Sequence, residues 1–151
     1  DCLVIGLDQS EHRLGKNSSY LQDSQEGELD NLILLRADCV DFWRLALNAG
    51  WQLHKHYILY PNPWPKKAHI KRRWHGHPVL KNLLALGGEF ELRSNWPVYV
   101  AEFSQALELL NYAVQQRGRL EESPDNYLTP FERKYALASQ PLFYLQANLS
   151  D

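Results

Sequence analysis

The sequence predicts an α/β protein with a mainly parallel β-sheet and an antiparallel edge. Short apolar runs that end near polar residues alternate with segments of helical periodicity along most of the chain. This alternation is typical of parallel strands joined by right-handed helical crossovers. Toward the C-terminus two further strands follow with no predicted helix between them, which indicates an antiparallel pair. We therefore expect one domain over residues 1–151.

The first three strands are predicted where short apolar runs are bounded by polar or turn-forming residues, and the later ones where the sequence returns to strand character. Runs of four or five such residues are typical of strands buried in a parallel sheet. Pro61 is expected to end the strand before it, because proline cannot donate a ladder hydrogen bond. The expected strands are Leu3–Leu7, Leu32–Leu35, Tyr57–Tyr60, Glu89–Arg93, Ala113–Leu120 and Leu142–Leu149.

Helices are predicted where apolar side chains recur at helical spacing between these strands. Ser10 is suited to cap the first helix, Gly87 and Gly88 to end the third, and Pro97 to begin the last. The polar residues 23–31 are expected to form a loop. The expected helices are Ser10–Tyr20, Val40–Leu47 with Phe42, Trp43, Leu45 and Ala46 facing the core, Pro78–Leu86, and Pro97–Leu110 with Val98, Ala101, Phe103, Ala106, Leu107 and Leu110 as its apolar positions.

Composition places the chain among globular proteins. The 151 residues are 44% hydrophobic and 23% charged, with a formal net charge of −2, and such a chain buries about two thirds of its unfolded surface. No apolar run approaches the roughly 20 residues of a bilayer span, and no signal-peptide pattern is visible. Cys2 and Cys39 are too few for a disulfide framework. We expect a cytoplasmic protein with no membrane partner.

Four polar residues follow predicted strands: Asp8, Asp38, Asn62 and Asn95. In open α/β sheets, ligands bind outside the carboxyl ends of the strands, so these residues indicate a ligand site. Asp8 suits the hydroxyl groups of a ribose, or alternatively the cap of the next helix. Asp38 suits the amino group of an adenine, although taken alone it is better explained as a helix cap.

The segment "YPNPWPKKAHIKRRWHGHP", residues 60–78, is predicted as a stiff loop at this edge. Its prolines restrict the backbone and so present Asn62 and Trp64 at low entropic cost. The Asn62 carboxamide offers a donor and an acceptor to a base edge, and Trp64 offers a stacking face. The alternative is an ordinary turn with a tryptophan packed on the surface.

The same segment carries a local concentration of positive charge in a slightly acidic protein. A run of charges is usually only a solvated face. A basic patch beside aromatic residues at a presumed ligand site, however, is the usual sign of an RNA-binding surface. We favour RNA binding for the patch, which consists of Lys66, Lys67, Lys71, Arg72 and Arg73.

Other chemistries have weaker support in the sequence. Two His-x-His pairs alone are poor evidence for a metal, because no cysteine cluster and no His-Glu-x-x-His motif accompanies them. There is also no Gly-x-Ser-x-Gly elbow for nucleophilic catalysis. We therefore expect no metal at the histidines, which are His54, His56, His69, His75 and His77.

Two motifs together are similar to those of one enzyme family. "YPNPWPKKAHIKRR" is similar to a strand-end Pro-Asp-Pro-Trp followed by Lys-Lys-x-His-x-Lys-Arg-Arg, and "LTPFERKY" (128–135) is similar to a C-terminal Thr-x-Phe-Glu segment. On these motifs, and on "VIGLD" and "LLRAD" as strands that end in the two acids, the chain resembles the bacterial tRNA (guanine-N7)-methyltransferases. These enzymes use S-adenosylmethionine and have a Rossmann-like fold.

The resemblance implies a Rossmann-like class I methyltransferase sheet, S-adenosylmethionine as cofactor and tRNA as partner. It also implies that the first strand and the glycine-rich cofactor loop precede residue 1, which leaves a gap in the sheet between the strands of Leu3 and Tyr57. The implied roles are Asp8 on the cofactor ribose, Asp38 on the adenine, Asn62 at the catalytic centre beside the methyl group and the guanine, Trp64, Lys66, Asn95, Thr129 and Glu132 on the substrate, and Lys67, Lys71, Arg72 and Arg73 on tRNA phosphates.

The chain departs from the family at positions 62 and 95, where amides replace the usual carboxylates. The amide at position 62 carries no negative charge, so Asn62→Asp is expected to raise guanine methylation if the amide is a handicap. Two alternatives remain open on the sequence. One is an amino-methyltransferase with an Asn-Pro-Pro-Tyr type of motif, and the other is a non-catalytic RNA-binding relative.

Overall fold

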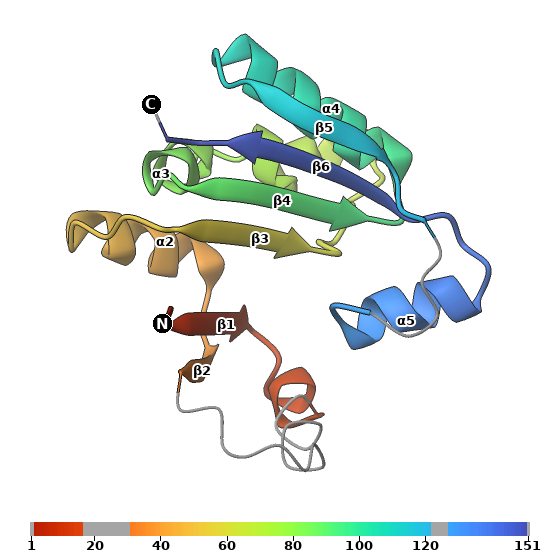
Figure 1. Cartoon of the computed structure of the whole chain (residues 1–151), viewed down its shortest axis with the longest axis horizontal. Coiled ribbons are helices and arrows are strands. Elements are labelled where there is room, and N and C mark those ends of the chain that lie inside the picture. The colour runs from red at the N-terminus through yellow and green to blue at the C-terminus, as the bar shows by residue number, and fades with distance from the viewer. Residues whose placement is uncertain (1, 17–30, 122–126, 151) are drawn as a thin grey trace.

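The computed structural model describes residues 2–16, 31–121 and 127–150, and it arranges their strands in two sheets. β1 (Val4–Asp8) and β2 (Leu32–Arg36) form a parallel pair. The larger sheet has the order β3-β4-β6-β5, which places β3 (Lys55–Leu59) at one edge and β5 (Val114–Arg119) at the other. Figure 1 shows that the arrows of β1, β3 and β4 point the same way.

The predicted antiparallel edge is confirmed. β4 (Glu89–Ser94) pairs in parallel with β3, whereas β6 (Phe143–Asn148) runs antiparallel to both β4 and β5. The expectation that no helix separates the two last strands is wrong. The helix α5 (Pro130–Leu137) lies between them in sequence, beside the end of the sheet at which β3 and β4 finish (Figure 1).

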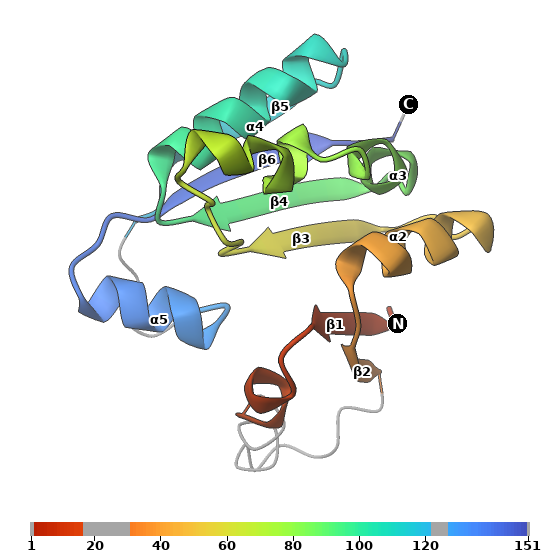
Figure 2. The same ribbon diagram turned by 180° about the vertical axis from the view of Figure 1, so that it is seen from behind.

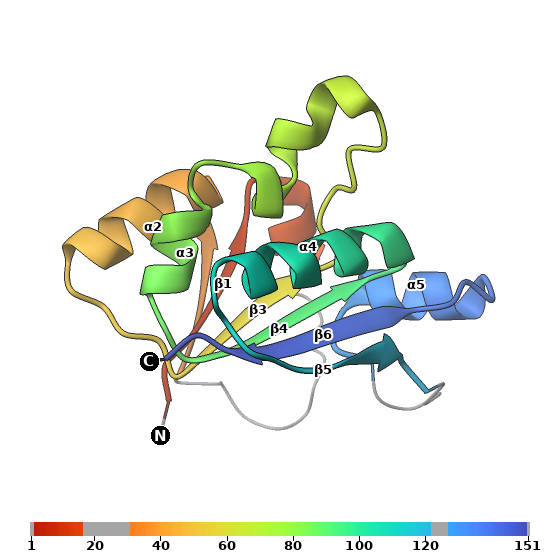
Figure 3. The same ribbon diagram turned by 90° about the horizontal axis from the view of Figure 1, so that it is seen from above.

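The helices of residues 39–48, 80–85 and 97–109 lie on one side of the larger sheet, as Figures 2 and 3 show. The first predicted helix is described only over residues 11–16, and the Ser10 side chain accepts a hydrogen bond from the Arg13 amide at its start. The rest of that helix and most of the loop at 23–31 lie outside the described residues. The remaining helices are α2 (Cys39–Asn48), α3 (Leu80–Ala85) and α4 (Pro97–Leu109), with two short 3₁₀ helices η1 (Lys67–Arg72) and η2 (Trp74–Gly76).

The hydrophobic core lies between these helices and the larger sheet. Phe90 of β4 stacks on Phe103 of α4 with 5.2 Å between ring centroids, and both are almost fully buried. Trp43 and Ala46 of α2 are buried as expected, but Leu45 is 67% exposed. Leu45 was placed on the wrong side of the helix, because spacing alone does not fix where an apolar stripe ends.

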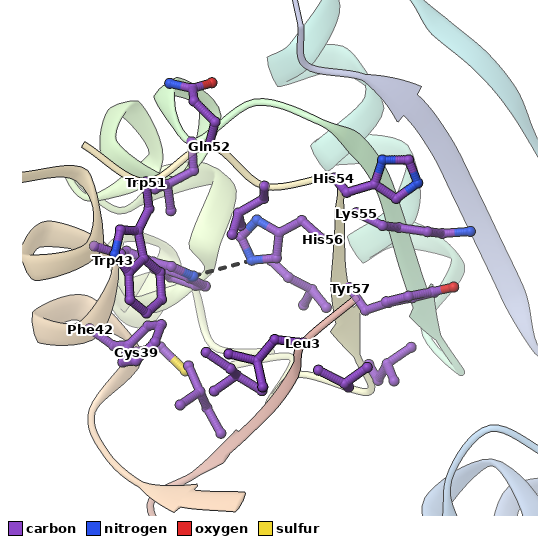
Figure 4. A pocket seen from close by; sticks show the side chains of 18 of the residues that line it. Leu3, Cys39, Phe42, Trp43, Trp51, Gln52, His54, Lys55, His56 and Tyr57 are labelled. Atoms are coloured by element: carbon purple, nitrogen blue, oxygen red, sulfur yellow. Dashed lines mark hydrogen bonds between the residues drawn. The ribbon is translucent and has the colours of Figure 1, made fainter. Parts of the chain in front are cut away.

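A cavity of about 550 Å³ separates β1 from β3, as expected for a sheet with a gap at this place. Figure 4 shows the side chains that line it, including Leu3, His56 and Tyr57. The expectation that the first two strands are buried is wrong among the described residues: Val4 is 51% exposed and Ile33 is 41% exposed. Within the described part of the chain, no helix is long and apolar enough to cross a bilayer.

Candidate active site

The four polar residues predicted to follow strands do lie at the carboxyl ends of four parallel strands. Asp8 is the last residue of β1, and Asn95 comes directly after β4. Asp38 follows β2, and Asn62 follows β3 after a short interval. Because these strands point the same way (Figure 1), their ends form one edge of the molecule. We call this edge the strand-end rim.

The Asp8 carboxylate is held by the start of the following helix. Its Oδ1 accepts hydrogen bonds from the Ser10 amide at 2.8 Å and from Arg13 Nη2 at 2.8 Å, and Oδ2 accepts from Arg13 Nε at 2.9 Å. Burial alone would raise the pKa of Asp8, but the hydrogen bonds and charge of Arg13 outweigh it, so the pKa is lowered. Asp8 is therefore ionised at neutral pH and orients a cation.

Asp38 caps α2, which was the alternative interpretation of this residue. Its Oδ1 accepts a 2.7 Å hydrogen bond from the Val40 amide at the first turn. Its Oδ2 accepts one from Gln9 Nε2, also at 2.7 Å. Gln9 directly follows β1, so this hydrogen bond ties together the carboxyl ends of β1 and β2.

The loop after β3 has two strained residues on either side of Asn62. Tyr60 and Trp64 have φ angles of 53° and 43°, in the left-handed region that non-glycine residues rarely adopt. The Asn62 carbonyl oxygen accepts a 3.3 Å hydrogen bond from the Trp64 amide. The sequence left both ends of this carboxamide available, whereas in the structure its oxygen already accepts this hydrogen bond, on a residue that is exposed.

The Trp64 ring is already covered by two neighbours from η1. The Arg72 guanidinium lies over the ring at 4.8 Å from its centroid, and the His69 ring meets it edge-on at 5.5 Å. A base that stacked on the face covered by Arg72 would have to displace that guanidinium. Stacking on Trp64 therefore stays a prediction, and the structure adds Arg72 as a second planar group at the same place.

The basic segment is folded into η1 and η2, where the sequence predicted an irregular loop. The side chains of Lys66, Lys67, Lys71 and Arg72 are exposed. Arg73 is different, since it is only 8% exposed and its guanidinium bonds the Trp64 carbonyl oxygen and Glu102 of α4. The predicted phosphate contact of Arg73 does not suit this buried and paired position.

The Thr-x-Phe-Glu segment forms the start of α5. Thr129 is its N-cap, and the Thr129 hydroxyl oxygen accepts a 3.1 Å hydrogen bond from the Glu132 amide. The Glu132 carboxylate is buried and accepts from the Tyr60 hydroxyl at 2.8 Å and from Arg93 Nη1 at 2.9 Å and 3.1 Å. A direct substrate contact of Thr129 and Glu132 stays a prediction.

Sequence reasoning missed Arg93 and Tyr60 as parts of this site. Arg93 also donates to Glu91 at 2.7 Å, and its two carboxylate partners, opposing the effect of burial, raise its pKa. Burial and the Glu132 hydrogen bond raise the pKa of the Tyr60 hydroxyl, so it stays protonated as a donor. One sequence signal could have revealed helix α5, which brings Glu132 to these residues. Thr129 is followed three residues later by Glu132, a pattern typical of a helix start.

Two further contacts connect α5 and its surroundings to the strand-end rim. Arg13, the partner of Asp8, lies 5.9 Å from the centroid of the Phe131 ring. Asn95 donates a 2.9 Å hydrogen bond through its NH₂ group to the Gln140 side chain, just beyond α5. The structure thus brings the segments of Asp8, Asn62, Asn95 and Thr129 to one side of the molecule.

In the structure, His56, His75 and His77 each bond a different partner. The His56 Nε2 accepts a 3.1 Å hydrogen bond from the Trp43 indole (Figure 4), and the His77 Nδ1 accepts one from the Val79 amide. His75 pairs with Glu102 at 2.9 Å. Among residues 2–16, 31–121 and 127–150, no group of three or more His, Cys, Asp or Glu side chains is arranged to hold a metal ion.

A family model described as "Putative methyltransferase" matches residues 1–145. The chain is 36% identical over 120 residues to the tRNA (guanine-N(7)-)-methyltransferase of Chromobacterium violaceum, which covers 72% of this chain and 50% of that protein. It is 34% identical over 130 residues to the enzyme of the same name from Halorhodospira halophila, with 82% and 55% covered. The chain thus spans about half the length of the curated relatives it matches.

Two solved structures with a similar fold carry the name methyltransferase. A putative methyltransferase complexed with SAH has a TM-score of 0.67 at 12% identity, with 97% of this chain and 39% of that chain covered. The 16S rRNA methyltransferase KamB has a TM-score of 0.63 at 17% identity, with 99% and 77% covered. These similarities show the Rossmann-like class I methyltransferase fold that the sequence predicted.

Proposed function

Since this chain belongs to the putative methyltransferase family, we propose that the protein transfers a methyl group from S-adenosylmethionine to N7 of a guanine in tRNA. The curated relatives named above carry that activity in their names. The observation that carries the proposal is the loop after β3. It holds Asn62 exposed at the strand-end rim, between two strained residues and directly before a row of exposed cations.

The cofactor fits the acids at the ends of β1 and β2. The Asp8 carboxylate is ionised, and a carboxylate has about four acceptor positions, so it can bind ribose hydroxyl groups while it keeps Arg13. Each oxygen of Asp38 already accepts one hydrogen bond, Oδ1 from the Val40 amide and Oδ2 from Gln9. An adenine amino group would therefore donate to an oxygen that already has one of these partners. When bound, the cofactor supplies an electrophilic methyl group on a sulfonium sulfur.

The chemistry needs no general base from the protein. Guanine N7 has a free lone pair at neutral pH, which would form the new N–CH₃ bond as the S–CH₃ bond of a bound cofactor broke, so that the positive charge would pass from sulfur to the base. The protein therefore contributes in-line positioning and electrostatic stabilisation. The strained loop with Asn62 is suited to positioning, because its geometry is set by the surrounding fold.

The partner in this proposal is tRNA, bound in the cytoplasm. Phosphate contacts supply most of the affinity of a nucleic-acid complex. The exposed cations that follow Asn62 are placed to make such contacts while a guanine reaches the loop. We assign this role to Lys66, Lys67, Lys71 and Arg72.

The test is methyl transfer to a defined tRNA. The purified protein is incubated with an unmodified tRNA transcript and methyl-labelled S-adenosylmethionine, and the labelled nucleoside is identified by mass spectrometry. We expect 7-methylguanosine. A matched transcript with 7-deazaguanosine, which lacks N7, should take up no label.

Two results would overturn the proposal. Another methylated nucleoside would assign the amino-methyltransferase chemistry that the Asn-Pro segment also allows. Binding of tRNA without any label would make the protein an RNA-binding relative. The pairing of Asp8 with Arg13 is the observation that favours this second outcome, since it leaves a cofactor ribose only the acceptor positions that Ser10 and Arg13 do not use.

A further inference from the structure

Arg73 differs from the other cations of its segment in being buried beneath the loop that presents Asn62. A charged side chain is almost never fully buried unless it is paired, and Arg73 is paired on two sides. Its Nε and Nη2 atoms lie 3.2 Å and 3.1 Å from the carbonyl oxygen of Trp64. Its Nη1 atom donates to Oε2 of Glu102.

Glu102 anchors this arrangement to the core helix α4. It accepts from Arg73 and from His75 Nε2 at 2.9 Å. Burial would raise the pKa of Glu102, but the hydrogen bonds from Arg73 and His75 outweigh it and lower the pKa. The carboxylate therefore stays charged at neutral pH, and the guanidinium is held in a fixed orientation by a residue of α4.

The other end of the arrangement is the Trp64 peptide. Trp64 has a φ of 43°, a conformation that a non-glycine residue keeps only when its surroundings impose it. The two hydrogen bonds from Arg73 to the Trp64 carbonyl oxygen are such a restraint. The amide of the same residue donates to Oδ1 of Asn62. Because the Trp64 amide donates to the Asn62 oxygen, the NH₂ group is the end of this exposed side chain that the hydrogen bond does not use.

We propose that Arg73 is a positioning residue that acts through the Trp64 backbone to aim the Asn62 NH₂ group at the substrate base. The inference rests on the proposed function. Guanine presents two acceptors on the edge that carries N7, namely N7 and O6, whereas adenine has a donor at N6. An outward NH₂ group donates to O6 of guanine and is repelled by the adenine amino group. The Glu102–Arg73–Trp64–Asn62 relay thus makes position 62 selective for guanine.

The experiment is a double-mutant cycle between Arg73 and Asn62. Arg73→Lys keeps a positive charge but cannot span the Trp64 carbonyl and Glu102 together, and Asn62→Ala removes the aimed group. In the wild-type background we expect Arg73→Lys to lower kcat for guanine methylation on the order of 10²-fold, the usual effect of a misplaced group, without a change in Kd for tRNA. In the Asn62→Ala background Arg73→Lys should have no further effect. Arg44→Lys, an exposed position on α2, is the control.

Several outcomes would overturn the proposal. An equal loss of kcat in both backgrounds would mean that Arg73 does not act through Asn62. A weaker Kd for tRNA with a flatter salt dependence would mean that Arg73 binds phosphate after all. If Arg73→Lys does not fold, Glu102→Gln is used in the same cycle, because it removes the charge that orients Arg73.

A second measurement separates this proposal from the proposed function. Hydrogen exchange at the Trp64 amide should be faster in Arg73→Lys than in the wild type, whether or not the protein methylates tRNA. Unchanged exchange would refute the relay. Faster exchange in a protein that leaves guanine unmethylated would support the relay as a structural restraint, and would refute both its role in guanine selection and the proposed function.

Discussion

The Tyr60 hydroxyl donates a 2.8 Å hydrogen bond to Oε2 of Glu132, a residue 72 positions later in the chain. Arg93 Nη1 donates to the same carboxylate. Glu132 therefore connects the ends of β3 and β4 with the first turn of α5. The strained backbone of Tyr60 is held in part by this hydrogen bond, directly before the loop that carries Asn62.

Glu132→Gln tests whether this carboxylate stabilises the fold. We expect the free energy of unfolding to fall by about 1–3 kcal/mol, because Arg93 loses one of its two buried charged partners and keeps Glu91. Urea unfolding measures this loss in the free energy of unfolding. Glu89→Gln on β4, the strand of Arg93, is the matched control, since Glu89 is exposed and its carboxylate makes a 3.7 Å ion pair with Lys55. Equal effects of the two changes would contradict the structural role of Glu132.

Asn62→Asp distinguishes two views of position 62. On the sequence alone, a restored carboxylate is expected to raise guanine methylation. We expect the opposite on our proposal for Arg73, because the Asn62 oxygen accepts from the Trp64 amide and the NH₂ group is then the end proposed to face the base. A carboxylate would keep that hydrogen bond and turn an acceptor toward O6 of guanine. We expect kcat for guanine methylation to fall, and a rise would show that negative charge matters more than donation.

Replacing Lys67, Lys71 and Arg72 together by Ala should weaken tRNA binding and flatten its dependence on salt. Each lost phosphate contact lowers the slope of log K against log salt by about 0.7–0.9. Binding titrations at several salt concentrations give this slope. The control changes Arg44 and Lys81 to Ala, which are exposed on α2 and α3. An unchanged slope in the triple variant would remove η1 from the RNA interface.

His56 should make the protein less stable in mild acid. Burial lowers the pKa of His56 to about 4 from 6.5, so the unfolded chain binds a proton first as the pH falls. The free energy of unfolding contributed by this residue is complete above about pH 6.5 and decreases toward about pH 4, by about 3 kcal/mol in total. Urea unfolding of wild type and His56→Gln across this range measures the difference.

The glutamine in that variant keeps an acceptor for the Trp43 indole but cannot titrate, so its stability should depend less on pH. His54→Gln, at an exposed position on the same segment, should behave as the wild type. If wild type and His56→Gln show parallel pH profiles, the acid sensitivity has another source.

Gly88 and Gly50 form a matched pair for the effect of a tight backbone contact. Both have positive φ angles, 84° and 74°, so either change to Ala should cost about 1 kcal/mol of backbone strain. A Cβ at Gly88 would also lie 2.2 Å from the Leu53 carbonyl oxygen, whereas one at Gly50 meets nothing within 4 Å. Thermal unfolding should show a clearly larger loss for Gly88→Ala. Equal losses would mean that the β3–β4 connection relaxes easily.

Much of the fold was predictable because its signals are local. The six described strands were found near their observed positions, and β1 and β2 in particular are short apolar runs between polar or turn residues. The Gly87-Gly88 end of α3 and the Pro97 start of α4 were predicted from backbone preferences alone. Helix α5 was missed because it is short and weakly apolar, and its cap residues were assigned to substrate.

The candidate site was only partly predictable, because its geometry depends on residues far apart in the chain. In "KKAHIKRR" all five cations look equivalent, yet Arg73 is buried by a partner on α4 that lies 29 positions later. The availability of Asn62, Trp64 and Glu132 likewise depends on which of their atoms the surrounding fold already uses.

The sequence by itself therefore determined the order of the strands and of helices α2, α3 and α4, the residues that follow each strand, and the family to which the chain belongs. Local backbone preferences and short sequence motifs set these properties, so they can be recognised without the tertiary structure. Only the tertiary structure decided which cations face solvent, which atom of the Asn62 amide is already hydrogen-bonded, and which carboxylates are already paired. Those properties are set by burial and by hydrogen-bond partners, and both exist only after distant segments have packed together.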